Sequence, residues 1–359
     1  MNDTNMNRLP VPTWNQCGVN TAPAAAALPE NPGDWGEANF AVTLPAGVGE
    51  SEEEFTAFAE SGMGAEVDAF MLENATVRHA LTVAEGVTVA EPAVFEFTLD
   101  AAHPNAVSVL DVDVKANASV TLVQVLRGDA ENGVAANLVR IRAAEGAHVK
   151  LVQVQLLGSR ARRWDAVAVE ESTSARVEQV RVELGGSVSA CGTRALLDHA
   201  KAEYDLDAVY FGGAEAVLDY NDVSVHTAKD TLCEMHTAGV LTGNASKILR
   251  GTIDFRRGAK RGVGHESEDV LLFSPTARNR TAPLILCGEE EVEGQHAASI
   301  GRLDEEKLYY LRSRGLSEAQ ARRLMVDARF APALDKIPPE ALRTEVQEEA
   351  ARRLDDHAE

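Results

Sequence analysis

Aromatic residues are scarce in this chain of 359 residues: Phe, Trp and Tyr make up only 5% of it, although 45% is hydrophobic. A core with so few rings is built from Val, Leu and Ala, which favours many short, regular strands. Basic residues are also few, since 34 Lys and Arg stand against 56 Asp and Glu and give a formal charge of −22. So acidic a chain repels phosphate groups, and we expect neither nucleic acid nor an anionic membrane surface as a partner.

The sequence also lacks long hydrophobic runs. No stretch approaches the roughly 20 apolar residues that span a bilayer, and residues 1–20 contain no apolar segment of the kind found in secretory signals. The cysteines Cys17, Cys191, Cys233 and Cys287 lie far apart and form no C-x-x-C pair. They are too sparse for a disulfide framework and fit a reducing compartment, so we predict a cytoplasmic protein.

Residues 1–75 differ in character from the rest of the chain. Six prolines fall within the first 50 residues, and the segment has little periodicity, which predicts an extended arm. Trp14, Trp35 and Phe40 are candidate anchors that would hold this arm on the rest of the protein. Spaced apolar residues between 51 and 71 indicate one short helix within the arm.

From about Thr76 to residue 300, short runs of alternating apolar and polar residues succeed one another without a convincing helix between them. Alternation with a period of two predicts strands that have one buried face. The runs include residues 120–125, 137–142, 149–154, 166–169, 177–182, 203–207 and 216–220.

A weak repeat accompanies this alternation. Strands begin at Ala118, Ala147, Ala175 and Ala202, at separations of 29, 28 and 27 residues, and each interval contains one further strand. Two strands per repeat are typical of a solenoid. An antiparallel sandwich also spaces its strands evenly but favours Asn-Gly or Asp-Gly hairpins, and only one such pair occurs. We therefore predict a mainly β protein with a parallel β-helix over residues 76–300, and a β-sandwich is the alternative.

Residues 301–359 change to a period near 3.6 and predict a helical C-terminal unit. Leu308 and Leu311 lie on one face of a first helix. The capping box Ser317-Glu-Ala-Gln320 opens a second helix. A last helix, over about 340–355, is mostly charged, and we expect it to be solvated.

The most specific motif is the range His296–Gly315, which reads HAASIGRLDEEKLYYLRSRG. It resembles the SufB/SufD family of iron–sulfur assembly scaffolds, in which a His-Gly-Ala-Thr or His-Glu-Ala-Thr element precedes Gly-x-Leu-Asp-Glu-Glu and Leu-x-Ser-Arg-Gly. A Ser-Glu-x-x-Ala helix then comes next in the family and is matched here by residues 317–321. Upstream, Lys247–Ile253 resembles a strand of the family that ends in Gly before an apolar pair. The resemblance extends over residues 205–330.

The resemblance implies a right-handed parallel β-helix that pairs through its β-helix with a SufB-like paralogue or with itself. It also implies that the C-terminal helices dock the ABC-type ATPase SufC, and the apolar residues that would form this dock are Leu308, Tyr309, Leu311, Leu324 and Met325. Because the chain has no G-x-x-x-x-G-K-[ST] motif, ATP chemistry would come from the partner. The implied role is a non-enzymatic scaffold with no intrinsic cofactor, on which a transient iron–sulfur cluster is assembled.

His296 is the first candidate cluster ligand, because an imidazole suits iron and the resemblance places this histidine at the cluster-forming interface. The alternative is a strand-end histidine that serves packing. The thiolates of the family are missing here, since Gly294 stands where SufD-like sequences often carry Cys. Glu268 falls close to the sulfur-accepting Cys of SufB-like members. A carboxylate can bind iron but cannot accept a persulfide sulfur, which points to a SufD-like role.

Other candidate ligands carry weaker signals. Cys287 lies nine residues before His296 and could reach the same region, although isolated cysteines are usually small buried hydrophobes. Cys233 and His236 have metal-ligand spacing, but residues three apart in a strand point to opposite faces.

Two other functions remain open at this point. Parallel β-helices also host polysaccharide lyases and hydrolases that use acidic side chains, and Asp205, Asp207, Asp219 and Asp222 would be the candidates. The few aromatic platforms for sugars, and the lack of a secretory signal or matching motif, disfavour that interpretation. The third possibility is a purely structural partner of the ATPase that never binds iron.

Overall fold

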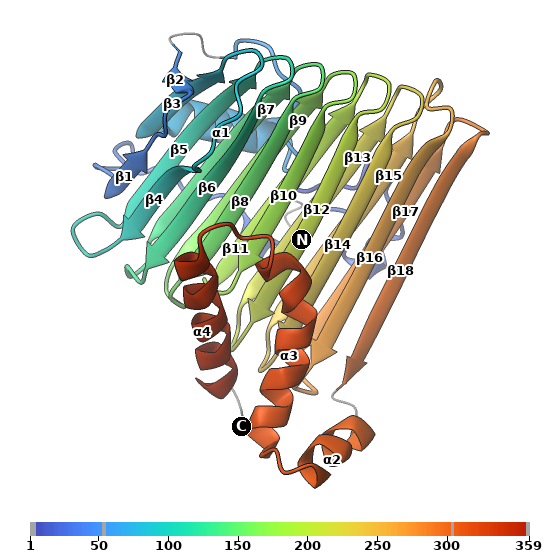
Figure 1. Ribbon diagram of the computed structural model, residues 1–359. Helices are drawn as coiled ribbons and strands as arrows, with labels where there is room; N and C mark the ends of the chain where they lie inside the picture. Colours follow the sequence, from blue (N-terminus) through green and yellow to red (C-terminus); the bar gives the residue numbers. More distant parts are fainter. Residues whose placement is uncertain (1–4, 52–54, 303–304, 357–359) are drawn as a thin grey trace.

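The computed structural model describes residues 5–51, 55–302 and 305–356. Its body is a β-solenoid whose strands alternate between two sheets, here called sheet A and sheet B (Figure 1). In order across sheet A, the described strands are β1 (Phe40–Thr43), β4 (Ala93–Leu99), β6 (Ser119–Gly128), β8 (His148–Leu157), β10 (Arg176–Glu183), β12 (Glu203–Gly212), β14 (Leu232–Leu241), β16 (Gly262–Leu272) and β18 (Val292–Arg302). In order across sheet B, they are β17 (Arg278–Cys287), β15 (Ser246–Phe255), β13 (Val217–His226), β11 (Val188–Leu197), β9 (Arg162–Glu171), β7 (Val134–Ala143), β5 (Asn105–Val114), β3 (Val77–Val83) and β2 (Val48–Glu50).

The strands from β3 onward pair in parallel within each sheet, which confirms the predicted solenoid. The register advances from Val120 to Val149, then to Val177 and to Tyr204, so the turns have the 29, 28 and 27 residues expected from the alanine spacing. The strands β1 and β2 of the N-terminal arm instead pair antiparallel with β4 and β3.

The turns that lead from sheet B to sheet A share one backbone feature. All of them except the turn between β17 and β18 place a residue in the left-handed region, and these residues are Gly86, Asn117, Gly146, Ser174, Lys201, Asp230 and Arg261. Only two of them are glycine, and an L-residue with a side chain pays about 1–2 kcal/mol for this conformation. The turn geometry is therefore set by the solenoid rather than by local preference.

The helices lie outside the two sheets. They are the short 3₁₀ helices η1 (Asn15–Cys17) and η2 (Ala24–Ala26) and the α-helices α1 (Ala65–Asn74), α2 (Glu305–Ser313), α3 (Glu318–Leu334) and α4 (Glu340–Asp356). No helix in the described ranges is long and apolar enough to cross a membrane.

The N-terminal arm covers the outer face of sheet B. Met63, Val67 and Met71, of which the last two lie in α1, pack with Val109 and Trp164 of the sheet. The predicted anchor Trp35 joins this cluster and is buried, whereas Trp14 is 81% exposed. The short helix expected between residues 51 and 71 exists, but it begins at Ala65.

The helices α3 and α4 cover the outer face of sheet A (Figure 1). The expectation that the last helix is solvated is wrong, because Leu342, Val346 and Leu354 are buried against valines of sheet A. Val346 follows Leu342 by four residues and Leu354 follows Val346 by eight, so the three side chains form one narrow apolar stripe on a helix that is otherwise charged.

Candidate functional site at the open end of the solenoid

The last turn of the solenoid has no turn above it within the described residues. Strands β17 and β18 each have a single neighbour, so each sheet ends in an edge strand there (Figure 1). Residues of β18 are exposed along nearly all of its length, including Ile300, which is 48% exposed. Unpaired strand edges of this kind offer backbone donors and acceptors to another chain.

His296 lies in the middle of β18 and is exposed. Its register partner on the neighbouring strand β16 is Glu266. Side chains of register partners in parallel strands point to the same face of the sheet. Because Glu266 is buried in the interior, His296 continues the interior face to the open end.

Glu266 was not singled out from the sequence, yet it has an unusual environment. It is 6% exposed, and its Oε2 has no hydrogen-bond partner within the part of the chain that the structure describes. Burial raises the pKa of Glu266 to about 7, and the nearby acidic Glu268 and Asp222 add to this effect while Lys247 opposes it. The carboxyl lies directly against Gly251, where a Cβ atom would come within 1.9 Å of Oε1.

Glu268, a predicted metal ligand, is buried and already has partners. It forms an ion pair with Lys247, and Thr281 Oγ1 donates a hydrogen bond to its Oε2 at 2.6 Å. Burial lowers the pKa of Lys247, although the charge of Glu268 opposes this shift. A metal ion bound by Glu268 would therefore have to displace a buried lysine.

The predicted cysteine and histidine ligands do not come together. Cys287 is the exposed last residue of β17, whereas Cys233 is fully buried in β14, and burial raises the pKa of its thiol. His236 lies on the opposite face of β14, as the strand spacing predicted, and its Nδ1 is 2.9 Å from Ser267 Oγ. No group of three or more His, Cys, Asp or Glu side chains that could hold a metal ion occurs in the part of the chain that the structure describes.

The predicted docking residues of the C-terminal helices fall into two groups. Tyr309 of α2 is 77% exposed and Leu324 of α3 is 47% exposed, while Leu308 and Leu311 of α2 are half-buried. Met325 is only 8% exposed because it packs, with the rest of α3, on sheet A. In this conformation Met325 belongs to the intramolecular contact rather than to the free surface.

The acidic residues proposed for an enzymatic site are all engaged in ion pairs. Asp205 and Asp207 lie on the outer face of sheet A, where Asp205 pairs with Arg176 and Asp207 pairs with Lys336 of the C-terminal unit. The other two pairs lie on opposite faces of sheet B and are Asp219–Arg250 and Asp222–Arg181.

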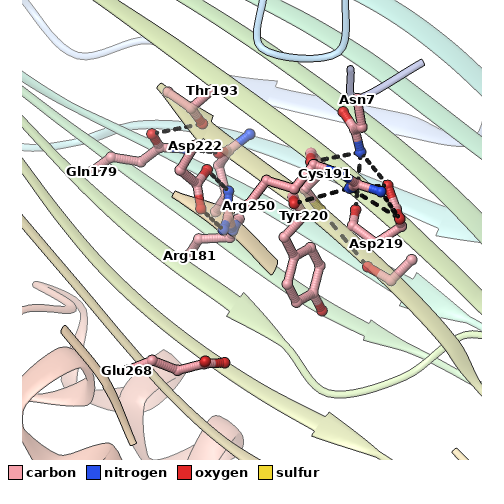
Figure 2. Close-up of polar contacts among 12 residues, drawn as sticks. Asn7, Gln179, Arg181, Cys191, Thr193, Asp219, Tyr220, Asp222, Arg250 and Glu268 are labelled. Carbon is pink, nitrogen blue, oxygen red and sulfur yellow. Dashed lines mark hydrogen bonds and ion pairs between the residues drawn. The ribbon is translucent and has the colours of Figure 1, made fainter. Parts of the chain in front are cut away.

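Figure 2 shows the polar contacts of sheet B on its two sides. Toward the interior, Arg181 Nη1 and Nη2 reach the two carboxylate oxygens of Asp222 at 2.8 and 2.7 Å. Toward the arm, Asn7 Nδ2 donates to Asp219 Oδ1 at 2.7 Å, and Arg250 Nη1 donates to the same atom at 3.0 Å (Figure 2). The second contact set fixes the arm on the sheet.

A column of glutamines runs through the interior and was missed by sequence reasoning. Gln153 Nε2 donates to Gln124 Oε1 at 3.0 Å, and Gln179 Nε2 donates to Gln153 Oε1 at 2.9 Å. Part of the signal was present, because Gln124 and Gln153 are register partners that each precede a valine, whereas Gln179 is the register partner of Leu151. These hydrogen bonds join three successive turns of the solenoid.

The geometry so far defines a parallel β-solenoid with one open end and helices packed on its outer faces. The family model that describes the SufBD core domain of the SUF system of FeS cluster assembly matches residues 97–329. The chain therefore belongs to the SufBD family. The match begins well before residue 205, where the resemblance in the sequence became specific.

Individual relatives agree with this assignment. The chain is 30% identical over 150 residues to the iron-sulfur cluster assembly protein SufD of Bacillus subtilis. This match covers 42% of this chain and 34% of that protein. It is 43% identical over 174 residues to an iron-sulfur cluster assembly SufBD family protein of Pyrococcus horikoshii, and the match covers 45% of this chain and 38% of that protein. A SufBD family protein of Staphylococcus aureus is 23% identical over 203 residues, and the match covers 56% of this chain and 44% of that protein. The matched region spans less than half of the length of each of these relatives.

Proposed function

We propose that this chain is a scaffold component of iron–sulfur cluster assembly in the cytoplasm, which docks a SufC-type ATPase and pairs with a SufB-like paralogue or with itself. It acts without catalytic residues or an intrinsic cofactor, and the cluster is its transient cargo. Membership of the SufBD family supports the assembly role.

The observation that carries the docking proposal is the position of the exposed apolar side chains. Of the large apolar side chains that are exposed among the described residues, four fall between residues 300 and 324, namely Ile300, Tyr309, Tyr310 and Leu324. Exposed apolar side chains gathered in this way are typical of a protein interface. Three of the four belong to α2 and α3, which therefore form the proposed dock.

The open end supports the pairing proposal. Strands β17 and β18 leave the last edge of each sheet without a neighbour among the described residues, and Ile300 adds apolar surface there. In this arrangement His296 would lie at the seam between the two proteins. Since Gly294 provides no thiolate, and Glu268 is paired with Lys247, a partner would supply the sulfur ligands of a cluster.

The enzymatic alternative receives no support from the aspartates, because all four are held in ion pairs that join strands, the arm or the C-terminal unit to one another. The purely structural alternative differs from the proposal only in iron binding, which a His296→Ala variant tests.

The dock is tested by substitutions at its apolar residues. We expect Leu308→Asp or Leu324→Asp to abolish pull-down of the SufC-type ATPase of the same organism, because truncation of a central interface anchor costs about 2 kcal/mol or more. Val11→Asp is the matched control, since Val11 and Leu324 are both 47% exposed. Circular dichroism should show an unchanged β-rich spectrum for all variants. Retained pull-down by both leucine variants would refute the dock.

A further inference from the structure

We infer that the cleft between α2, α3 and the end of β16 binds an acidic segment of the docked ATPase through three arginines. This inference rests on the proposed function, because it assumes that α2 and α3 are the dock. It adds the chemistry by which the partner is recognised.

The cleft has a volume of about 620 Å³ and separates the C-terminal helices from the turn after β16. Leu308 and Tyr309 of α2 line it on one side, and Phe273 lines it on the other. Its polar lining consists of Arg302 at the end of β18, Arg312 of α2, and Glu318 and Arg322 of α3, together with Ser274.

The lining of the cleft contains more arginine side chains than carboxylates. Glu318 Oε1 is 2.6 Å from Arg322 Nη2, and its Oε2 is 3.5 Å from Arg312 Nη1, so one carboxylate is shared by two guanidinium groups. Arg322 Nε is buried and has no hydrogen-bond partner among the described residues. Each guanidinium has five N–H donors in a fork that matches a carboxylate. Among the described residues that line the cleft, Glu318 is the one carboxylate that these donors meet.

The local charge contrasts with the charge of the whole chain. Residues 302–323 contain six basic and four acidic residues, although the chain as a whole carries −22. A positive cleft on an acidic protein attracts a partner through its acidic residues and disfavours a second copy of the same acidic surface. The exposed Tyr309 at the rim, with the exposed Tyr310 of α2 and Leu324 of α3, indicates a protein partner rather than a free anion.

The occupant is therefore a segment of the ATPase that carries Asp or Glu beside apolar residues. Aromatic and arginine side chains together are the usual anchors of such contacts. The Arg322 guanidinium lies over the Phe273 ring, 5.8 Å from its centroid, so one of these anchors already contacts an aromatic ring of the cleft.

The test measures the dissociation constant between the full chain and the SufC-type ATPase at about 50 mM and about 300 mM NaCl, since salt screens exposed charges. We expect Arg312→Glu to weaken binding at least about 30-fold at low salt, and to remove most of the salt dependence. Arg256→Glu is the matched control, because it makes the same charge change at the opposite end of the strands. Its side chain is 51% exposed, and that of Arg312 is 56% exposed.

The outcomes separate this inference from the dock itself. One outcome is that Leu308→Asp loses binding, while Arg312→Glu binds as tightly as the unsubstituted chain and neither depends on salt. That result would support the dock but overturn the proposal that it binds an acidic segment. Equal weakening in Arg312→Glu and Arg256→Glu would also overturn it, because the effect would then come from net charge. Full binding by Leu308→Asp, Leu324→Asp and Arg312→Glu would refute the dock and the inference together. Displacement of the ATPase by millimolar inorganic phosphate would assign the cleft to a small anion instead.

Discussion

Buried charges inside the solenoid join strands of the two sheets. Arg181 of β10 binds Asp222 of β13, and Lys247 of β15 binds Glu268 of β16, so each pair connects sheet A with sheet B. Removing one partner of such a pair leaves an uncompensated buried charge, which typically costs about 3–5 kcal/mol. Glu266 differs from these residues because no described residue forms a hydrogen bond with its Oε2.

Glu266 should therefore make stability depend on pH. Its folded-state pKa is about 7, above the ordinary value of 4.5, so between these values the unfolded chain releases a proton that the folded chain keeps. The free energy of unfolding should fall as pH rises from about 4.5 to about 7, by about 3 kcal/mol at most, and then stay constant with respect to this group.

We expect Glu266→Gln to remove this part of the pH dependence and to be more stable than the unsubstituted chain at pH 8. The measurement is urea unfolding between pH 5 and pH 8. Glu234→Gln is the control, since Glu234 lies on the outer face of β14 and its side chain is 50% exposed. Identical pH profiles for the unsubstituted chain and Glu266→Gln would contradict the prediction.

His296 should behave as a binding residue rather than a structural one. Because it is exposed on an edge strand, we expect His296→Ala to change the unfolding free energy by less than about 0.5 kcal/mol. The variant should retain less iron and sulfide after anaerobic reconstitution of the complex with its partners. A loss of thermal stability with constant iron per folded molecule would instead assign the histidine to packing, and full retention with unchanged stability would support the purely structural alternative.

The sequence predicted His296 as a site residue but could not predict Glu266. The histidine belongs to a motif that is contiguous along the chain, whereas Glu266 gains its properties from Gly251 and Asp222 on strands of the other sheet. Met325 shows a different limit of prediction. The sequence identifies it as an apolar residue, but it does not show that the side chain is buried against sheet A.

At the level of elements, the repeated turns offer a direct test of how the solenoid imposes backbone geometry. Lys201 has a φ of 62° in the turn between β11 and β12. Glycine adopts this conformation without the penalty of a Cβ atom, which outweighs its larger entropy loss. We expect Lys201→Gly to stabilise the protein by up to about 1 kcal/mol, measured by urea unfolding. Lys201→Ala removes the same charged side chain and keeps the Cβ, so it should bring no gain, and a gain of equal size would contradict this explanation.

Strands were easier to predict than helix environments. The alternation and the spacing of Ala118, Ala147 and Ala175 follow from chain-local patterns, and the observed register reproduces them. The burial of α4 depends on a stripe with only one apolar residue per turn, such as Leu342 and Val346, which is hidden by the surrounding charges. Such a stripe can be recognised as a buried face only once the valines of sheet A are known to lie opposite it.

At the scale of the whole molecule, the two ends of the solenoid differ. The N-terminal end is closed by β1 and β2 of the arm, and Phe40 packs on Phe97 with ring centroids 4.8 Å apart. At the other end, the described residues add no further strand beside β17 and β18. Solenoids require a covered terminal turn for solubility, and a partner that continues both sheets would provide it.

This difference predicts that the C-terminal end associates. We expect the chain, alone or mixed with a SufB-like paralogue, to show the mass of a dimer by light scattering, and Ile300→Lys to shift it toward monomer. The lysine would introduce a charge at an edge strand that would otherwise be covered, and charged edge residues are a common means of preventing strand pairing. Val42→Lys in β1, whose valine is 38% exposed at the other edge of sheet A, is the control and should leave the mass unchanged. If Ile300→Lys dimerises as well as the control does, the open end is not the pairing surface.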